Sequence, residues 1–166
     1  MGTYAYVEFD TATKKQIHKY QVLANLPNAV RPDKLHSTLL YSRAPMDGYK
    51  PAGNYYFPLV ARPAGLAIWE SKNDDGTVSK CLVAMLSCPH LVERHNFLMD
   101  EHNGTFDFPT YVPHVTLSYD VHDLDIEQLP FFEELVPHLV AIAEHSEPLD
   151  ECVDIKSHKI NAVDFN

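Results

Sequence analysis

The sequence predicts an α+β fold built from two similar halves. A strand, a helix and a second strand are expected over residues 3–41, and the same order recurs over residues 78–119. The second strand of each half also carries nearly the same string of residues. A repeat at about half the chain length is typical of an internal duplication. We therefore expect one bilobal domain over residues 1–166, with its halves related by a pseudo-twofold axis.

Alternating side chains predict the first strand, residues 3–9, with one face apolar and covered. Its other face carries Tyr4, Tyr6 and Glu8. Asp10 or Thr11 is expected to cap a helix that ends before Pro27. The apolar stripe of that helix is Ile17, Tyr20, Leu23 and Ala24. Residues 35–41 then form the second strand.

Prolines and glycines dominate residues 44–63, which contain four prolines and two glycines. Such composition predicts a long irregular loop, with at most a short edge strand over residues 55–60. Residues 66–70 and 78–87 are two further strands. They flank an Asn-Asp-Asp-Gly turn at residues 73–76, a strong hairpin signal.

The second half repeats the first. Pro89 suits the first turn of a helix and Gly104 suits its end, and residues 114–119 form the next strand. The tail predicts a helical stretch around residues 131–145 and a strand over residues 153–165. The acidic residues of this region are expected on solvated helix faces. They are Glu133, Glu134, Glu144 and Glu147.

Charge and composition limit the classes of function. The chain has 23 acidic and 13 basic residues, a formal charge of −10, which disfavours binding to long DNA or RNA but leaves a small anionic ligand open. No apolar run approaches the roughly 20 residues of a membrane span, and no export signal is visible. Cys81, Cys88 and Cys152 lack metal or disulfide spacing. A cytoplasmic protein with buried thiols is expected.

One string recurs in the second strand of each half. Residues 35–42, Leu-His-Ser-Thr-Leu-Leu-Tyr-Ser, align without gaps on residues 113–120, Pro-His-Val-Thr-Leu-Ser-Tyr-Asp. Residues two apart in a strand share a face, so His36 lies beside Thr38 and His114 beside Thr116. Leu39 and Leu117 are expected to pack on the opposite face. Each half therefore offers one imidazole next to one hydroxyl.

Two such pairs facing each other would suit chemistry on a phosphodiester. A neutral histidine can take a proton from an attacking hydroxyl while a protonated one gives a proton to the leaving oxygen. The threonine hydroxyls can donate to the non-bridging oxygens as charge develops on them. The two histidines leave open which is the base and which is the acid.

These residues resemble the 2H phosphoesterase superfamily, whose mark is a pair of His-x-Thr motifs. More narrowly, the short acidic chain, its first strand and the string over residues 35–41 resemble phage anti-CBASS nucleases, which degrade cyclic oligonucleotide signals. The resemblance implies a bilobal fold with two antiparallel sheets lining a cleft and helices outside. It implies catalysis without a metal or other cofactor, on a cyclic di- or trinucleotide, in the host cytoplasm. The catalytic residues would be His36, Thr38, His114 and Thr116.

The rest of the site is inferred from residue type. Tyr4, Tyr6 and Trp69 offer flat surfaces on which a base could stack, and Arg43, beside the Pro-rich loop, could contact the polyanion. His90, His95 and His102 lack zinc-site spacing and are expected on the surface.

Two alternatives remain. The chain could be a phosphodiesterase of RNA ends or 2′-5′ oligonucleotides, or a nucleotide sponge that binds without cleaving. The oligomeric state is left open.

Overall fold

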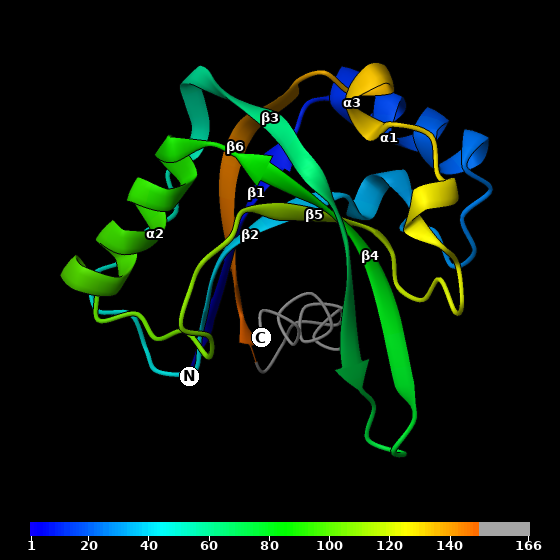
Figure 1. The fold of residues 1–166 in the computed structure, drawn as a ribbon. Helices are drawn as coiled ribbons and strands as arrows, with labels where there is room; N and C mark the ends of the chain where they lie inside the picture. Colours follow the sequence, from blue (N-terminus) through cyan, green and yellow to red (C-terminus); the bar gives the residue numbers. More distant parts are fainter. Residues whose placement is uncertain (150–166) are drawn as a thin grey trace.

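The computed structural model describes residues 1–149, which form antiparallel strands and short helices (Figure 1). The strands are β1 (Thr3–Phe9), β2 (His36–Ser42), β3 (Gly53–Lys72), β4 (Val78–Ser87), β5 (His114–Ser118) and β6 (Leu139–Pro148). The helices are α1 (Thr11–Leu23), α2 (Pro89–Glu101) and α3 (Phe132–Leu135), with 3-10 turns η1 (Pro32–Lys34) and η2 (Ile126–Gln128). The predicted α+β class is confirmed.

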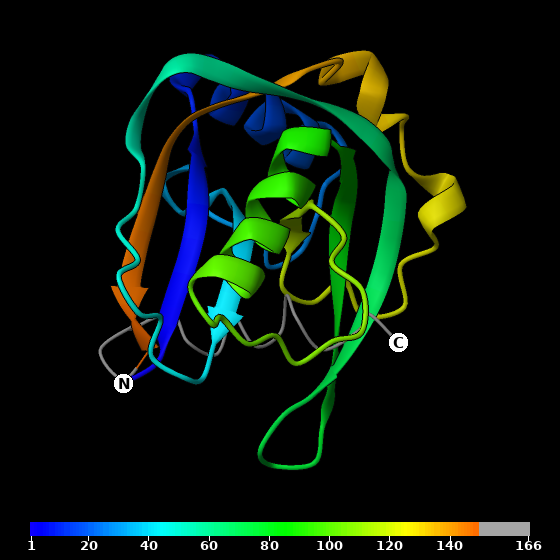
Figure 2. The ribbon, with the colours of Figure 1, turned by 90° about the vertical axis from the view of Figure 1, so that its left-hand side faces the viewer.

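The order of strands across the sheet reflects the duplication. It is β2-β1-β6-β3-β4-β5, so β1, α1 and β2 of the first half correspond to β4, α2 and β5 of the second. β6 flanks the first unit, β3 flanks the second, and these two pair at the centre. Both motif strands are thus edge strands. They nevertheless contact each other, because the sheet is strongly curved (Figures 1 and 2).

Strand β3 joins the two sheets that the resemblance implies. Its residues 53–61 pair with β6 and residues 62–72 pair with β4. The expected irregular loop is therefore wrong beyond residue 52. Pro58 and Pro63 lie at the two register shifts of this strand, where a residue without an amide hydrogen is tolerated. The prolines that suggested a loop are compatible with a bent central strand.

Helices α1 and α2 add Ile17, Tyr20, Leu91 and Leu98 to the main apolar core. Asp10 caps α1, because its carboxylate accepts a hydrogen bond from the Thr13 amide at 2.8 Å, a contact worth about 1 kcal/mol. Leu23 is 60% exposed and Gln21 is buried, so the predicted stripe is wrong at its C-terminal end. No helix within the described residues is long and apolar enough to cross a membrane.

The tail differs from the predicted helix. Helix α3 makes only about one turn, and residues 139–148 form β6. Pro137 cannot continue a helix, and β6 gains pairing with both β1 and β3. Glu144, expected on a solvated helix face, is fully buried. The strand predicted over residues 153–165 lies outside the described residues.

Candidate active site

A bulge follows the threonine in each motif strand. The extra residue is Leu39 on β2 and Leu117 on β5, by the register of each with its neighbour. Strict alternation would put Leu40 on the face of His36, but the bulge reverses the face. All three leucines are consequently fully buried in the main core. The predicted packing of Leu39 and Leu117 is confirmed, and the duplication extends to this irregularity.

His36 is held from two sides. Its Nδ1 lies 2.7 Å from the carbonyl oxygen of Lys34, and its Nε2 lies 2.7 Å from the hydroxyl of Tyr4. The same hydroxyl lies 2.7 Å from Oγ1 of Thr38. A carbonyl oxygen only accepts, so Nδ1 carries the proton and Nε2 of the neutral ring accepts from Tyr4. One phenol therefore bridges the imidazole and the hydroxyl of the first motif.

His114 repeats the first of these contacts. Its Nδ1 lies 2.9 Å from the carbonyl oxygen of Val112, which is two residues before it, as Lys34 is before His36. The indole of Trp69 meets the imidazole edge to face, with ring centroids 4.5 Å apart. The same tautomer follows in both motifs, so Nε2 is the unprotonated nitrogen of each neutral ring.

The surfaces beside the two histidines differ in chemistry. Strands β1 and β6 place Tyr6, Glu8 and His145 near His36. Strands β3 and β4 surround the second motif with mainly apolar side chains. These are Ala67, Trp69, Cys81, Val83 and Met85. The duplicated backbone therefore presents one polar wall and one apolar wall.

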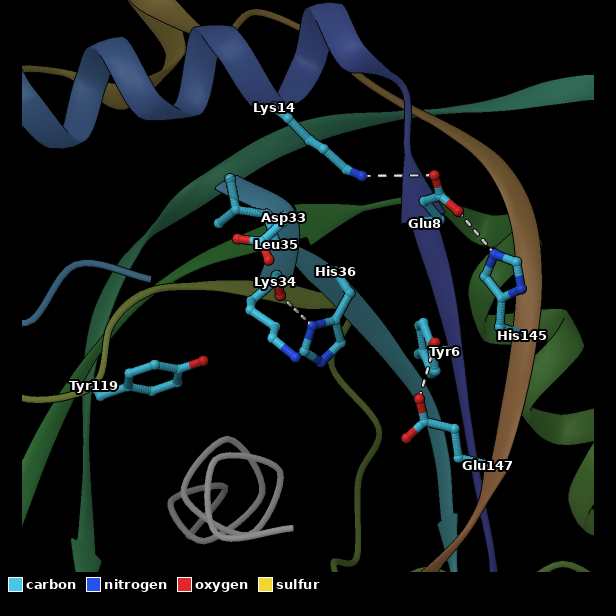
Figure 3. Close-up of a pocket in the computed structure, with 10 residues that line it drawn as sticks. All are labelled: Tyr6, Glu8, Lys14, Asp33, Lys34, Leu35, His36, Tyr119, His145 and Glu147. Carbon is cyan, nitrogen blue, oxygen red and sulfur yellow. Dashed lines mark hydrogen bonds and ion pairs between the residues drawn. The ribbon is translucent and has the colours of Figure 1, made fainter. Parts of the chain in front are cut away.

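A pocket of about 300 Å³ opens beside His36 (Figure 3). This volume is at the lower end of the range typical of small-molecule sites. Tyr6 and Tyr119 lie on different sides of it, and Lys14 and Lys34 contribute positive charge. The pocket thus combines aromatic rings, cations and carboxylates next to the first motif histidine.

Glu8 is the centre of an ionic group in this pocket. Its Oε1 lies 2.8 Å from Nε2 of His145, and its Oε2 lies 3.5 Å from Nζ of Lys14. The hydrogen bond from His145 holds the pKa of the Glu8 carboxyl below its ordinary value of 4.5, against the opposing effect of burial, and Lys14 adds to the lowering. Glu8 is accordingly a carboxylate at neutral pH.

The residues expected to bind substrate differ in their burial and in their contacts. Tyr6 lines the pocket, whereas Tyr4 is fully buried and contacts the first motif. Trp69 is 8% exposed and packs against His114. Arg43 is absent from the pocket lining, and its guanidinium pairs with Asp107 at 2.7 Å. Tyr6 and Trp69 therefore lie beside different histidines.

Sequence reasoning missed the ionic group of the pocket, which consists of Glu8, Lys14 and His145. Glu8 shares the strand face of Tyr4 and Tyr6, so its alternation could have found it. Lys14 gave no signal, since α1 brings it to the pocket only through the turn at Asp10. His145 was hidden by its assignment to a helix.

The three histidines expected on the surface do not share one environment. His90 is exposed and His102 is half-buried, but His95 is 5% exposed. The surface prediction is therefore wrong for His95. Among residues 1–149, no group of three His, Cys, Asp or Glu side chains could hold a metal ion. Cys81 and Cys88 are buried thiols outside any disulfide among the described residues, as predicted.

Sequence comparison identifies the family. The family model described as anti-CBASS protein Acb1 matches residues 1–156. The chain is 41% identical over 149 residues to the anti-CBASS protein Acb1 of Vibrio phage KVP40, covering 90% of this chain and 88% of that protein. It is 32% identical over 148 residues to the protein of that name from Enterobacteria phage T4, covering 89% and 88%.

Solved structures agree on the fold. LigT of E. coli complexed with 3′-AMP aligns with a TM-score of 0.54 at 14% identity, covering 87% of this chain and 84% of that chain. The apo form of LigT aligns with a TM-score of 0.50 at 14% identity, covering 87% and 85%. The chain therefore has the 2H phosphoesterase fold and belongs to the anti-CBASS Acb1 family.

Proposed function

We propose that this protein is a phosphodiesterase that cleaves 3′-5′ linkages of cyclic oligonucleotides and so counters CBASS during phage infection. The observation that carries the proposal is the matched pair of histidines, each bonded through Nδ1 to the carbonyl two residues before it. Two rings with the same tautomer offer two Nε2 atoms for proton transfer. Binding alone would not require them.

The reaction uses a hydroxyl of the substrate as nucleophile. Nε2 of one neutral histidine takes the proton of the ribose 2′-hydroxyl, and the 2′-oxygen attacks the adjacent phosphorus. The bond from phosphorus to the 5′-oxygen breaks, and the other histidine, as imidazolium, protonates that oxygen. The products are a 2′,3′-cyclic phosphate and a 5′-hydroxyl. Thr38 and Thr116 donate hydrogen bonds to the non-bridging oxygens as their charge grows.

Size and charge favour a short substrate. The pocket of about 300 Å³ beside His36 suits one nucleoside rather than a duplex. The net charge of −10 disfavours long RNA. Lys14 and Lys34 place two ammonium groups in this pocket, beside the carboxylates of its lining. The fold is also that of LigT, whose structure was solved with 3′-AMP.

Aromatic side chains are proposed to hold the bases. Tyr6 lies in the pocket next to His36, with ring centroids 5.4 Å apart, and Trp69 lies next to His114. A base stacked on either ring would bring its phosphate toward the nearby imidazole. Tyr4 supports the Tyr6 ring by stacking against it, with ring centroids 5.4 Å apart. Arg43 would have to exchange Asp107 for a phosphate to join them.

Product analysis tests the proposal. The full chain is incubated with cyclic dinucleotides and trinucleotides and with linear 2′-5′ and 3′-5′ oligoadenylates, each with and without excess EDTA. Chromatography should reveal linear products ending in a cyclic or opened phosphate from the cyclic 3′-5′ substrates, at equal rates in both buffers. His114→Ala is the matched control and should form these products at least about a hundredfold more slowly.

The alternatives predict other product patterns. Preferential cleavage of linear 2′-5′ oligoadenylates would support the RNA-end or 2′-5′ phosphodiesterase instead. Tight binding without any product would support a sponge. Loss of activity in EDTA, restored by a divalent cation, would contradict catalysis by the two histidines alone.

A further inference from the structure

The carbonyl groups of the two bulges receive side-chain hydrogen bonds from the opposite half of the chain. The bulge of β2, in the first half, is contacted by α2 of the second half. The bulge of β5, in the second half, is contacted by α1 of the first half. Edge strands have no further strand to satisfy such carbonyl groups. On β2 these contacts take the place of a neighbouring strand, and on β5 they add to a backbone hydrogen bond from Val30.

On β2 the donors are His95 and Tyr111. Nδ1 of His95 lies 2.7 Å from the carbonyl oxygen of Leu39, and the hydroxyl of Tyr111 donates to the carbonyl oxygen of Thr38 at 2.8 Å. The two rings are stacked, with centroids 4.2 Å apart and planes 4° apart. Phe106 meets the imidazole edge to face at 4.8 Å. This packing fixes the direction of both donors.

On β5 the donor is Gln21, which is 3% exposed on α1. Its Nε2 donates to the carbonyl oxygens of Leu117 and Val30, each at 2.9 Å. The amide of Val30 also donates to the carbonyl oxygen of Leu117, at 3.0 Å. Leu117 thus corresponds to Leu39 both in its bulge and in the buried polar side chain that contacts it.

We infer that His95 and Gln21 are positioning residues that orient Thr38 and Thr116, an inference that rests on the proposed phosphodiesterase function. Each carbonyl that they hold belongs to the bulge residue directly after the motif threonine. Holding that carbonyl fixes the geometry of the bulge, and a change in the bulge would displace the threonine before it and the strand that carries the histidine. Because each helix holds the motif of the other half, the contacts also link the two halves around the site.

Kinetics of two variants test the assignment. His95→Phe keeps a ring against Tyr111 but removes the donor, and Gln21→Met keeps the length of the side chain but removes its amide. We expect His95→Phe to lower kcat by about 10- to 100-fold, the scale of small misplacements, with KM within about twofold. Gln21→Met should lower kcat less, because Val30 still holds Leu117. His95→Asn, whose Nδ2 can replace Nδ1, should recover most of the rate.

Tyr20→Phe is the matched control. Tyr20 neighbours Gln21 on α1, is fully buried and donates to the carbonyl oxygen of Pro130 at 2.7 Å, but its hydroxyl donates to neither bulge. Its variant loses one buried hydrogen bond and should keep the wild-type kcat at a temperature where all variants are folded. An equal loss of kcat in Tyr20→Phe, or a rise in KM without a fall in kcat, would overturn the inference.

A measurement without turnover separates this inference from the function. Methyl resonances of Thr38 and Thr116 are recorded by NMR in the full-length apo protein. His95→Phe should shift or broaden the Thr38 signal and spare Thr116, Gln21→Met should do the reverse, and Tyr20→Phe should change neither. An inactive wild-type protein would refute the function alone. Equal changes at both threonines, or no change, would refute the positioning role whatever the activity.

Discussion

The hydroxyl of Tyr4 lies 2.7 Å from Nε2 of His36, the nitrogen that must gain or lose a proton if this histidine is catalytic. The same oxygen lies 2.7 Å from Thr38 Oγ1. With a neutral ring, Tyr4 donates to His36 and can accept from Thr38. With an imidazolium, Nε2 donates to Tyr4, whose proton then turns to Thr38. The protonation of His36 and the orientation of the Thr38 hydroxyl are therefore coupled.

Removing this hydroxyl should impair the chemical step. Tyr4→Phe keeps the buried ring but frees His36 and Thr38 from their common partner, so we expect kcat to fall by about tenfold with little change in KM. Steady-state kinetics with a cyclic dinucleotide measure this. Tyr20→Phe, which loses an equally short hydrogen bond elsewhere, is the control, and a wild-type kcat in Tyr4→Phe would exclude the bridging role.

The two histidines should act as a unit. His36→Ala and His114→Ala should each lower kcat by about a hundredfold or more, and the double variant should be only slightly slower than either, since one lost proton transfer already disables the step. Thr38→Val or Thr116→Val should cost a smaller factor and keep a bell-shaped pH profile. Rates across pH decide this. Additive histidine effects would argue for two independent roles.

The ion pair between Arg94 of α2 and the buried Glu144 of β6 should contribute to stability. Arg94 Nε lies 2.8 Å from Oε1 of Glu144, which is fully buried. Arg94→Met would leave this carboxylate without its cation. We therefore expect the free energy of unfolding, measured by urea denaturation, to fall by about 3 kcal/mol. Arg43→Met breaks an exposed pair with Asp107 and should cost under about 1 kcal/mol. Equal costs would contradict the importance of burial.

His95 should make folding sensitive to acid. Burial lowers the pKa of His95 below its ordinary value of 6.5, opposed by its hydrogen bond to Leu39. As pH falls below about 6.5, the unfolded chain takes up a proton that the folded chain resists, so the free energy of unfolding declines. In His95→Asn this decline should be shallower between about pH 7 and pH 5. In His90→Asn, at an exposed position of α2, the free energy of unfolding should depend on pH as in the wild type. The same pH dependence in His95→Asn would show that His95 is not the source of the acid sensitivity.

The sequence predicted correctly those elements that are determined by residues close together in the chain. The alternation over residues 3–9, the cap at Asp10 and the proline at the start of α2 all have their effect within a few residues, and the structure follows each. The recurrence of His-x-Thr-Leu gave both motif strands for the same reason. Its physical meaning, one imidazole beside one hydroxyl on each strand, needs only the alternation of a strand.

Long-range pairing explains what the sequence could not give. Residues 139–148 become β6 because two strands far away in the chain accept them, which no local preference reports. His95 is buried because α2 packs against the bulge of β2, and an isolated helix pattern offered no sign of that contact. The pocket residues Glu8 and His145 meet across β1 and β6 for the same reason.

Cleavage of a cyclic dinucleotide with 2′-deoxyribose at the linkage to be cut tests the central claim most directly. The account predicts that this analogue binds the wild-type protein with an affinity close to that of the ribose substrate, yet yields no linear product, because its nucleophile is missing. Binding by calorimetry and product by chromatography are measured on the same samples. Efficient cutting of the deoxy linkage would show that water attacks instead, and would contradict the two-histidine mechanism with substrate-assisted attack.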